Sequence, residues 1–97
     1  MLNIYYIGHS AFYIKTEKTG ILIDPFISGN PNSVFDLHTN KITNIFLTHA
    51  HADHLGDAIP ISKATRAEIT AIFELANYCM SKGALSKGIN LGGKIEY

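Results

Sequence analysis

The sequence predicts a mixed α/β fold in which helices cover one face of a β-sheet, and three observations support this class. Short β-prone runs fill the first 25 residues, a buried strand pattern returns at residues 44–47, and helical patterns then alternate with strand patterns. The 97 residues, 46% of them hydrophobic and 16% charged, suffice for one small core and argue against a disordered chain. We therefore expect one structural unit over residues 1–97.

The first part of the chain predicts three strands. Residues 2–7 and 11–15 are β-prone and partly alternating, and Gly8-His9-Ser10 between them predicts a tight turn that joins two antiparallel strands. Ile21-Leu22-Ile23 is an unbroken apolar run, typical of a strand that is covered on both faces and lies in the centre of a sheet. This strand ends at Asp24-Pro25, because proline lacks the backbone donor that a ladder needs.

A long irregular loop is expected between the third and fourth strands. Residues 26–43 are rich in Gly, Pro, Asn and Ser, and loops of this length in compact domains are usually functional or mobile. His38 lies in this loop and is predicted to be a solvated histidine. Residues 44–47 then predict a buried strand that ends directly before a group of histidines.

The second half of the chain predicts two helices and further strands. Asp57 is expected to cap a helix over residues 58–65, and residues 68–72 return to a strand pattern. A second helix is predicted over residues 73–82, with Gly83 directly after its end. Residues 94–97 begin to alternate as a strand does.

Composition excludes several classes of protein. Eight Lys and Arg balance eight Asp and Glu, so no positive field attracts nucleic acid. Neither a secretory leader nor an apolar run of about 18 residues is visible, so we expect no membrane association. Cys79 is the single cysteine, which excludes an intrachain disulfide and predicts a buried core residue. We expect a cytoplasmic protein.

One short segment carries the chemistry. Thr48-His49-Ala50-His51-Ala52-Asp53-His54 places four metal-ligand side chains within six residues, separated by small alanines. Imidazole nitrogen and carboxylate oxygen are ligands of zinc, manganese and iron. In an extended chain His49 and His51 project to the same side and can reach one ion, whereas Asp53 and His54 lie where the chain turns and can reach a second. A metal site is favoured over a polar loop, because crowded imidazoles repel each other whenever one is protonated.

This segment resembles the His-x-His-x-Asp-His signature of the metallo-β-lactamase superfamily. The resemblance extends along nearly the whole chain and is closest to the branch of predicted metal-dependent hydrolases related to ascorbate-6-phosphate lactonase. The segments that carry it are Tyr6-Ile7-Gly8-His9-Ser10-Ala11-Phe12, Ile21-Leu22-Ile23-Asp24-Pro25-Phe26, Leu55-Gly56-Asp57-Ala58, Phe73-Glu74-Leu75-Ala76 and Asn90-Leu91-Gly92-Gly93. The resemblance implies an αββα sandwich of two sheets between helices, with two divalent ions in a cleft at its edge.

The resemblance also implies a ligand set that this chain holds only in part. In the family, the residues matching His49 and His51 bind the first ion with a later histidine. Those matching Asp53 and His54 bind the second ion with another histidine, and a later aspartate bridges the ions. No His follows His54 and no Asp follows Asp57. We therefore expect residues 1–97 to be the N-terminal half of the fold, to bind metal weakly alone, and to associate with the C-terminal half or with another copy.

The implied activity is hydrolysis of a small-molecule lactone, ester or phosphoester by metal-bound hydroxide, with Asp53 and His54 as catalytic residues and with zinc, manganese or iron as the metal. Asp53 would orient the hydroxide while also acting as a ligand. The alternative is a truncated, non-catalytic remnant or subunit that binds metal or a partner chain. A redox di-iron role is disfavoured, because His51 stands where a carboxylate would better suit oxygen chemistry.

Two further residues have both a functional and a structural interpretation. His9 either lies near the metal cleft, as the same turn does in the resembling branch, or serves only as a hydrogen-bonded turn residue. Asp24 either braces the His49 loop from behind the metal ligands or forms an Asx turn before Pro25. The bracing role of Asp24 is slightly favoured.

Overall fold

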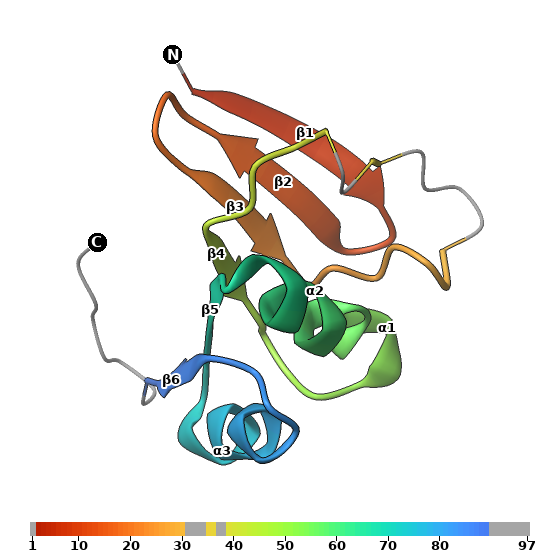
Figure 1. Ribbon diagram of the computed structural model, residues 1–97. Helices are drawn as coiled ribbons and strands as arrows, with labels where there is room; N and C mark the ends of the chain where they lie inside the picture. The colour runs from red at the N-terminus through yellow and green to blue at the C-terminus, as the bar shows by residue number, and fades with distance from the viewer. Residues whose placement is uncertain (1, 31–34, 37–38, 90–97) are drawn as a thin grey trace.

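The computed structural model describes residues 2–30, 35–36 and 39–89, and its centre is a six-stranded mixed sheet (Figure 1). The strands lie in chain order; β1 to β3 are antiparallel, and β3 to β6 are parallel. The strands are β1 (Asn3–Gly8), β2 (Ala11–Lys15), β3 (Gly20–Ile23), β4 (Asn44–Phe46), β5 (Glu68–Ala71) and β6 (Ser86–Gly88). The expected mixed α/β class is confirmed, with β3 inside the sheet as predicted.

The helices connect the parallel strands. They are α1 (Ala52–Leu55), α2 (Ala58–Thr65) and α3 (Phe73–Ser81). Parallel crossovers are almost always right-handed, so two successive crossovers that advance in one direction place α2 and α3 on the same face of the sheet. Their buried residues join the strands in one core, which includes Leu22, Ile45, Ile69, Ile61, Leu75 and Cys79. No helix in residues 2–30, 35–36 and 39–89 is long and apolar enough to cross a membrane.

The register separates the two faces of the sheet. Across one face run Tyr13, Leu22, Ile45 and Ile69, which are at most 1% exposed. The opposite face of β1 to β3 carries Tyr6, Phe12 and Ile23 in one row and Ile4, Ile14 and Ile21 in the next. The side chains of Ile4 and Tyr6 are 62% and 65% exposed, and the other four are partly exposed. The hairpin therefore presents an apolar surface on the face away from the core.

Several predicted elements are confirmed and two were missed. The helix over residues 58–65 has the predicted bounds, and α3 ends one residue before the predicted Lys82, with Gly83 following at a φ of 93°. Helix α1 and strand β6 were not predicted, because neither is long enough to show a periodic pattern. The strand predicted at residues 94–97 and His38 lie outside the described residues.

The prediction that the Asp57 side chain caps α2 is wrong. Asp57 occupies the N-cap position but makes no side-chain bond to the helix. Its carboxylate instead accepts hydrogen bonds from the backbone N–H of Ile27 and Ser28 and from the Ser28 hydroxyl. Gly56, at a φ of 48°, allows this contact, since a Cβ there would lie 2.4 Å from the Pro25 carbonyl oxygen. Asp57 thus fixes the chain after β3 against the start of α2.

Candidate metal centre

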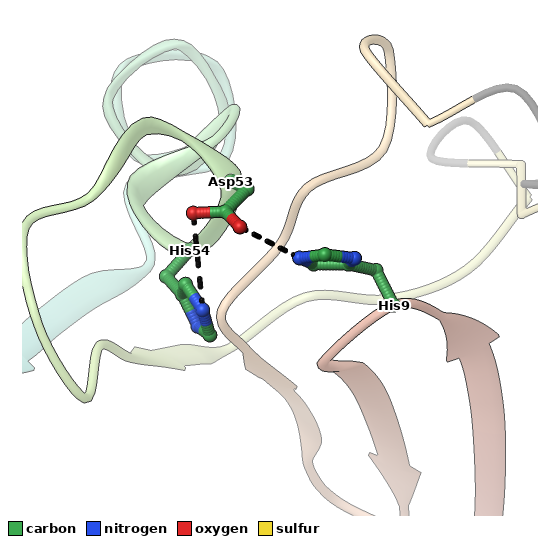
Figure 2. A group of neighbouring side chains, drawn as sticks. All are labelled: His9, Asp53 and His54. Atoms are coloured by element: carbon green, nitrogen blue, oxygen red, sulfur yellow. Dashed lines mark hydrogen bonds and ion pairs between the residues drawn. The ribbon is translucent and has the colours of Figure 1, made fainter.

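The candidate metal ligands gather where β3 and β4 end. These strands are parallel, so their carboxyl ends lie at the same edge of the sheet, where α/β proteins commonly bind ligands. Asp24 follows β3, His49 and His51 follow β4, and Asp53 and His54 lie on α1. The turn between β1 and β2 brings His9 to the same place (Figure 2).

Asp24 is the buried centre of this arrangement. It is 2% exposed and has a φ of 45°. Its carboxylate accepts hydrogen bonds from the Thr48 N–H at 2.8 Å and the Thr48 hydroxyl at 2.6 Å, and it lies 2.9 Å from His54 Nδ1. Because a carboxylate only accepts, His54 must carry its proton on Nδ1. In neutral His54, Nε2 is therefore an unprotonated nitrogen, as metal ligation requires.

Thr48 sets the position of the proton on the His49 ring. The Thr48 hydroxyl has one proton, which it donates to Asp24, so it accepts from His49 Nδ1 at 2.9 Å. This contact directs the proton of neutral His49 to Nδ1 and leaves Nε2 free. Asp24 thus orients His54 directly and His49 through one hydroxyl. The role of Thr48 was not predicted from the sequence, although its place between the buried strand and His49 was the available signal.

The imidazole rings of the motif form a compact group. The centroid of the His49 ring lies 4.7 Å from that of the His51 ring and 3.9 Å from that of the His54 ring. His49 and His51 are therefore neighbours in space, as their alternation along an extended chain implies. Crowded imidazoles are mutually unfavourable when protonated, but they suit a shared cation.

Asp53 links this group to His9. Asp53 Oδ2 lies 2.7 Å from His9 Nε2, and Asp53 Oδ1 lies 3.8 Å from His54 Nε2 (Figure 2). One ligand atom from each of these three residues lies within 4.8 Å of the others. The hydrogen bond from His9 is the main cause that holds the pKa of Asp53 below its usual value. The carboxyl of Asp53 is therefore ionised at neutral pH.

The donor set fits divalent cations. Two imidazoles present Nε2 in the form that binds metal, and an ionised carboxylate lies beside them. All four predicted ligands thus lie at one edge of the sheet, with Asp24 behind them and His9 in contact with Asp53. The Asx-turn interpretation of Asp24 does not account for its bonds to Thr48 and His54.

An apolar groove adjoins the histidine group. It has a volume of about 380 Å³. It runs between the chain around α1 and the start of α3, and its lining residues are His49, Ala50, Leu55, Ile72, Glu74, Leu75 and Tyr78. His49 therefore belongs both to the candidate metal centre and to the lining of this groove. Another cavity of about 410 Å³ lies beside the hairpin among Tyr5, Tyr13 and Phe35 and includes no histidine among its described lining residues.

Comparison with known sequences finds close similarity to metal-dependent hydrolases. Residues 5–84 match the sequence model of the metallo-beta-lactamase superfamily. A UPF0173 metal-dependent hydrolase from Desulforamulus reducens is 42% identical over 96 residues, covering 99% of this chain and 42% of its own length. One from Methanosarcina barkeri is 47% identical over 95 residues, covering 98% and 41%. The chain thus spans about two fifths of the length of these curated relatives.

Solved structures show the same fold. Igni18, a metallo hydrolase from the archaeon Ignicoccus hospitalis, superposes with a TM-score of 0.87 at 36% identity over 98% of this chain and 42% of its own. A possible metal-dependent hydrolase from Veillonella parvula superposes with a TM-score of 0.76 at 17% identity over 100% of this chain and 45% of its own, which is a likeness of fold alone. The described sheet and helices are thus the N-terminal part of this fold.

Proposed function

This chain belongs to the metallo-β-lactamase superfamily, and from that premise we propose that it carries the metal-binding edge of a hydrolase acting on a lactone, ester or phosphoester. The observation that carries the proposal is the position of Asp24, which sets the proton of His54 directly and that of His49 through Thr48. Histidines whose Nδ1 is held by such partners are typical of metal sites, because the contact fixes the ring and the tautomer.

The motif offers two pairs of ligands. We assign His49 and His51 to one ion and Asp53 and His54 to a second, with zinc or manganese as the expected metals and iron as a further candidate. Ions bound there would act as Lewis acids and lower the pKa of water to about 7. Asp53, ionised and in contact with His9 through Oδ2, would orient the attacking water, and His54 would fix the position of Asp53 through Oδ1.

We propose that the groove beside His49 receives the apolar part of the substrate. Ile72 and Tyr78 form its outer wall and are each 47% exposed, while Leu75 forms its floor. A substrate with an alkyl or aryl group in this groove would have its scissile bond next to His49. Sites of this kind commonly combine an apolar lining with a few polar groups. This arrangement favours an ester or lactone with an apolar substituent over a small, fully polar phosphoester.

We also propose that the apolar surface of the hairpin packs against polypeptide that corresponds to the remaining length of the relatives. Ile4, Ile14 and Ile21 lie side by side on that surface, and exposed apolar patches commonly mark interaction sites. Igni18 aligns with this chain over only 42% of its own length, so the larger part of that protein lies outside the matched region. A second copy of this chain is the competing occupant. The buried single Cys79 agrees with the proposed cytoplasmic location.

The alternative function is metal binding without turnover. Two ligands per ion from the motif are fewer than the three that a catalytic zinc normally takes from protein. This favours a non-catalytic metal-binding subunit for the 97 residues alone. Measured hydrolysis decides between the two.

The test is to purify the 97-residue protein, determine bound metal by elemental analysis, and assay lactone, aryl ester and phosphodiester substrates with and without added Zn²⁺ or Mn²⁺. The hydrolase proposal expects metal-dependent turnover that Asp53→Asn abolishes and that Glu17→Gln, a carboxylate-to-amide change in the exposed turn after β2, leaves intact. Bound metal without turnover would support the non-catalytic alternative. Absence of metal binding would contradict both.

A further inference from the structure

We propose that His9 is a third protein ligand of the ion assigned to Asp53 and His54, so that this chain alone holds one complete three-ligand metal site. The inference rests on the proposed metal centre but requires no catalytic activity. The motif supplies only two ligands for that ion, and His9 comes from 44 residues earlier in the chain. The tertiary fold therefore adds the ligand that the motif lacks.

The distances fit a shared ion. His9 Nε2 lies 2.7 Å from Asp53 Oδ2, and His54 Nε2 lies 3.8 Å from Asp53 Oδ1. One ligand atom from each residue lies within 4.8 Å of the other two. Metal–ligand bonds of about 2.0 to 2.2 Å place tetrahedral donors about 3.4 Å apart, so small rotations of the side chains suffice to close the site.

The backbone holds His9 in place. His9 has a φ of 58°, a left-handed conformation that only a minority of non-glycine residues adopt. The Tyr6 hydroxyl donates to the His9 carbonyl oxygen at 2.7 Å, and the His9 ring meets the Phe26 ring edge to face at 5.4 Å. The imidazole of His9 is thus directed at one carboxylate oxygen of Asp53, while His54 lies nearest the other oxygen, as Figure 2 shows. A turn residue that served geometry alone would not need this direction.

A hydrogen bond and a metal bond use the same atom of His9. Without a cation, Nε2 of His9 donates its proton to the ionised Asp53. A cation bound by Asp53 and His54 would require this proton to move to Nδ1 of the same neutral ring, because metal ligation requires an unprotonated nitrogen. The free Nε2 of His54 is in the required form before the metal arrives, and the Asp53 carboxylate already lies beside both imidazoles.

Scalar coupling between ¹¹³Cd and ¹⁵N tests the inference directly. The protein is labelled with ¹⁵N-histidine and titrated with ¹¹³Cd²⁺, and the imidazole nitrogens are observed by long-range ¹H–¹⁵N correlation. We expect cadmium coupling at Nε2 of both His9 and His54, together with loss of the proton from Nε2 of His9. Couplings at His49 and His51 would report the other ion separately.

The matched variants are His9→Asn and His38→Asn. Asparagine tolerates a positive φ, so it preserves the turn at position 9 while removing the ring. We expect His9→Asn to lose one cadmium coupling and to weaken affinity for this ion by at least about 10- to 100-fold, the range seen when even a supporting contact is removed. His38→Asn removes a histidine that lies neither in the motif nor in the turn between the first two strands of the sequence, and this variant should bind cadmium as the unaltered protein does.

Each other outcome is decisive. Coupling at His54 with a retained proton on Nε2 of His9 would overturn the inference and leave the proposed metal centre intact. Absence of any cadmium coupling would overturn both. Should His9→Asn fail to fold, the couplings of the unaltered protein alone decide the question.

Discussion

Asp24 Oδ2 and His54 Nδ1 lie 2.9 Å apart, although 30 residues separate them in the sequence. Asp24 is 2% exposed, so its charge is kept from water and is stabilised by its partners. The same carboxylate accepts both the N–H and the hydroxyl of Thr48. One buried group thus joins the end of β3, the end of β4 and helix α1 at the candidate metal centre.

Asp24→Asn tests this junction. Asparagine tolerates the positive φ and keeps the shape of aspartate, but it lacks the negative charge. Its side-chain NH₂, which is itself a donor, must face one of the groups that now donate to Asp24. We expect a loss of about 1 to 3 kcal/mol in the free energy of unfolding and a 10- to 100-fold weaker affinity for zinc. Urea unfolding and zinc titration measure the two effects. Unchanged values in both would show that Asp24 does not organise the site, and Glu17→Gln is the control.

Thr48→Val separates the role of the hydroxyl from that of the fold. Valine keeps the branched shape but removes the bond that directs the His49 proton to Nδ1. We expect His49 to populate both tautomers in long-range ¹H–¹⁵N spectra of the metal-free protein, with a stability loss of about 1 kcal/mol. Thr65→Val removes a hydroxyl bond to the Ile61 carbonyl and should leave the His49 spectrum unchanged. A single, unaltered His49 tautomer in Thr48→Val would contradict the proposal that the Thr48 hydroxyl sets the position of the His49 proton.

The raised pKa of the Tyr13 phenol predicts a loss of stability at alkaline pH. Burial, with a smaller contribution from Tyr5, raises the pKa of the Tyr13 phenol, which donates to the Lys41 carbonyl oxygen at 2.7 Å. The pKa of Tyr13 in the folded state exceeds the unfolded value of about 10. The contribution of the Tyr13 phenol to the free energy of unfolding is therefore complete below pH 10 and is lost as pH rises through the folded-state pKa.

Urea unfolding between pH 8 and 11 measures this effect. Tyr13→Phe should cost about 1 kcal/mol at pH 8 through the lost hydrogen bond and should show a shallower decline above pH 10. Tyr78→Phe, at a half-exposed position on α3, is the control for the substitution itself. Parallel declines for Tyr13→Phe and the unaltered protein would contradict the prediction.

The apolar surface of the hairpin predicts association. When the polypeptide proposed to cover this surface is absent, we expect the 97-residue protein to self-associate at micromolar concentration in sedimentation velocity. Ile4→Lys should reduce this association, because it introduces a charge on the surface. Leu85→Lys, at a position 52% exposed after α3, should have little effect. A strictly monomeric unaltered protein would show that a second copy does not occupy the surface. Equal effects of the two variants would show that the surface is not specific.

Much of the fold follows from local sequence. The apolar run Ile21-Leu22-Ile23, the proline after Asp24 and Gly83 at a helix end each act on their immediate neighbours, and the corresponding elements formed where predicted. Asp57 shows the limit of such reasoning. It has the right residue type and position for a cap, but the chain after β3 offers backbone donors that local sequence does not reveal.

The chemical character of the candidate site is encoded locally, because His49-Ala50-His51-Ala52-Asp53-His54 holds four side chains of ligand type within one short segment. Which distant groups contact these side chains depends on the pairing of strands far apart in the sequence. Asp24 and His9 reach the motif because β3 lies parallel to β4 and the first hairpin turns toward the same sheet edge. Strand pairing depends on long-range register, and that register joined a carboxylate and an imidazole to a motif more than 20 residues away.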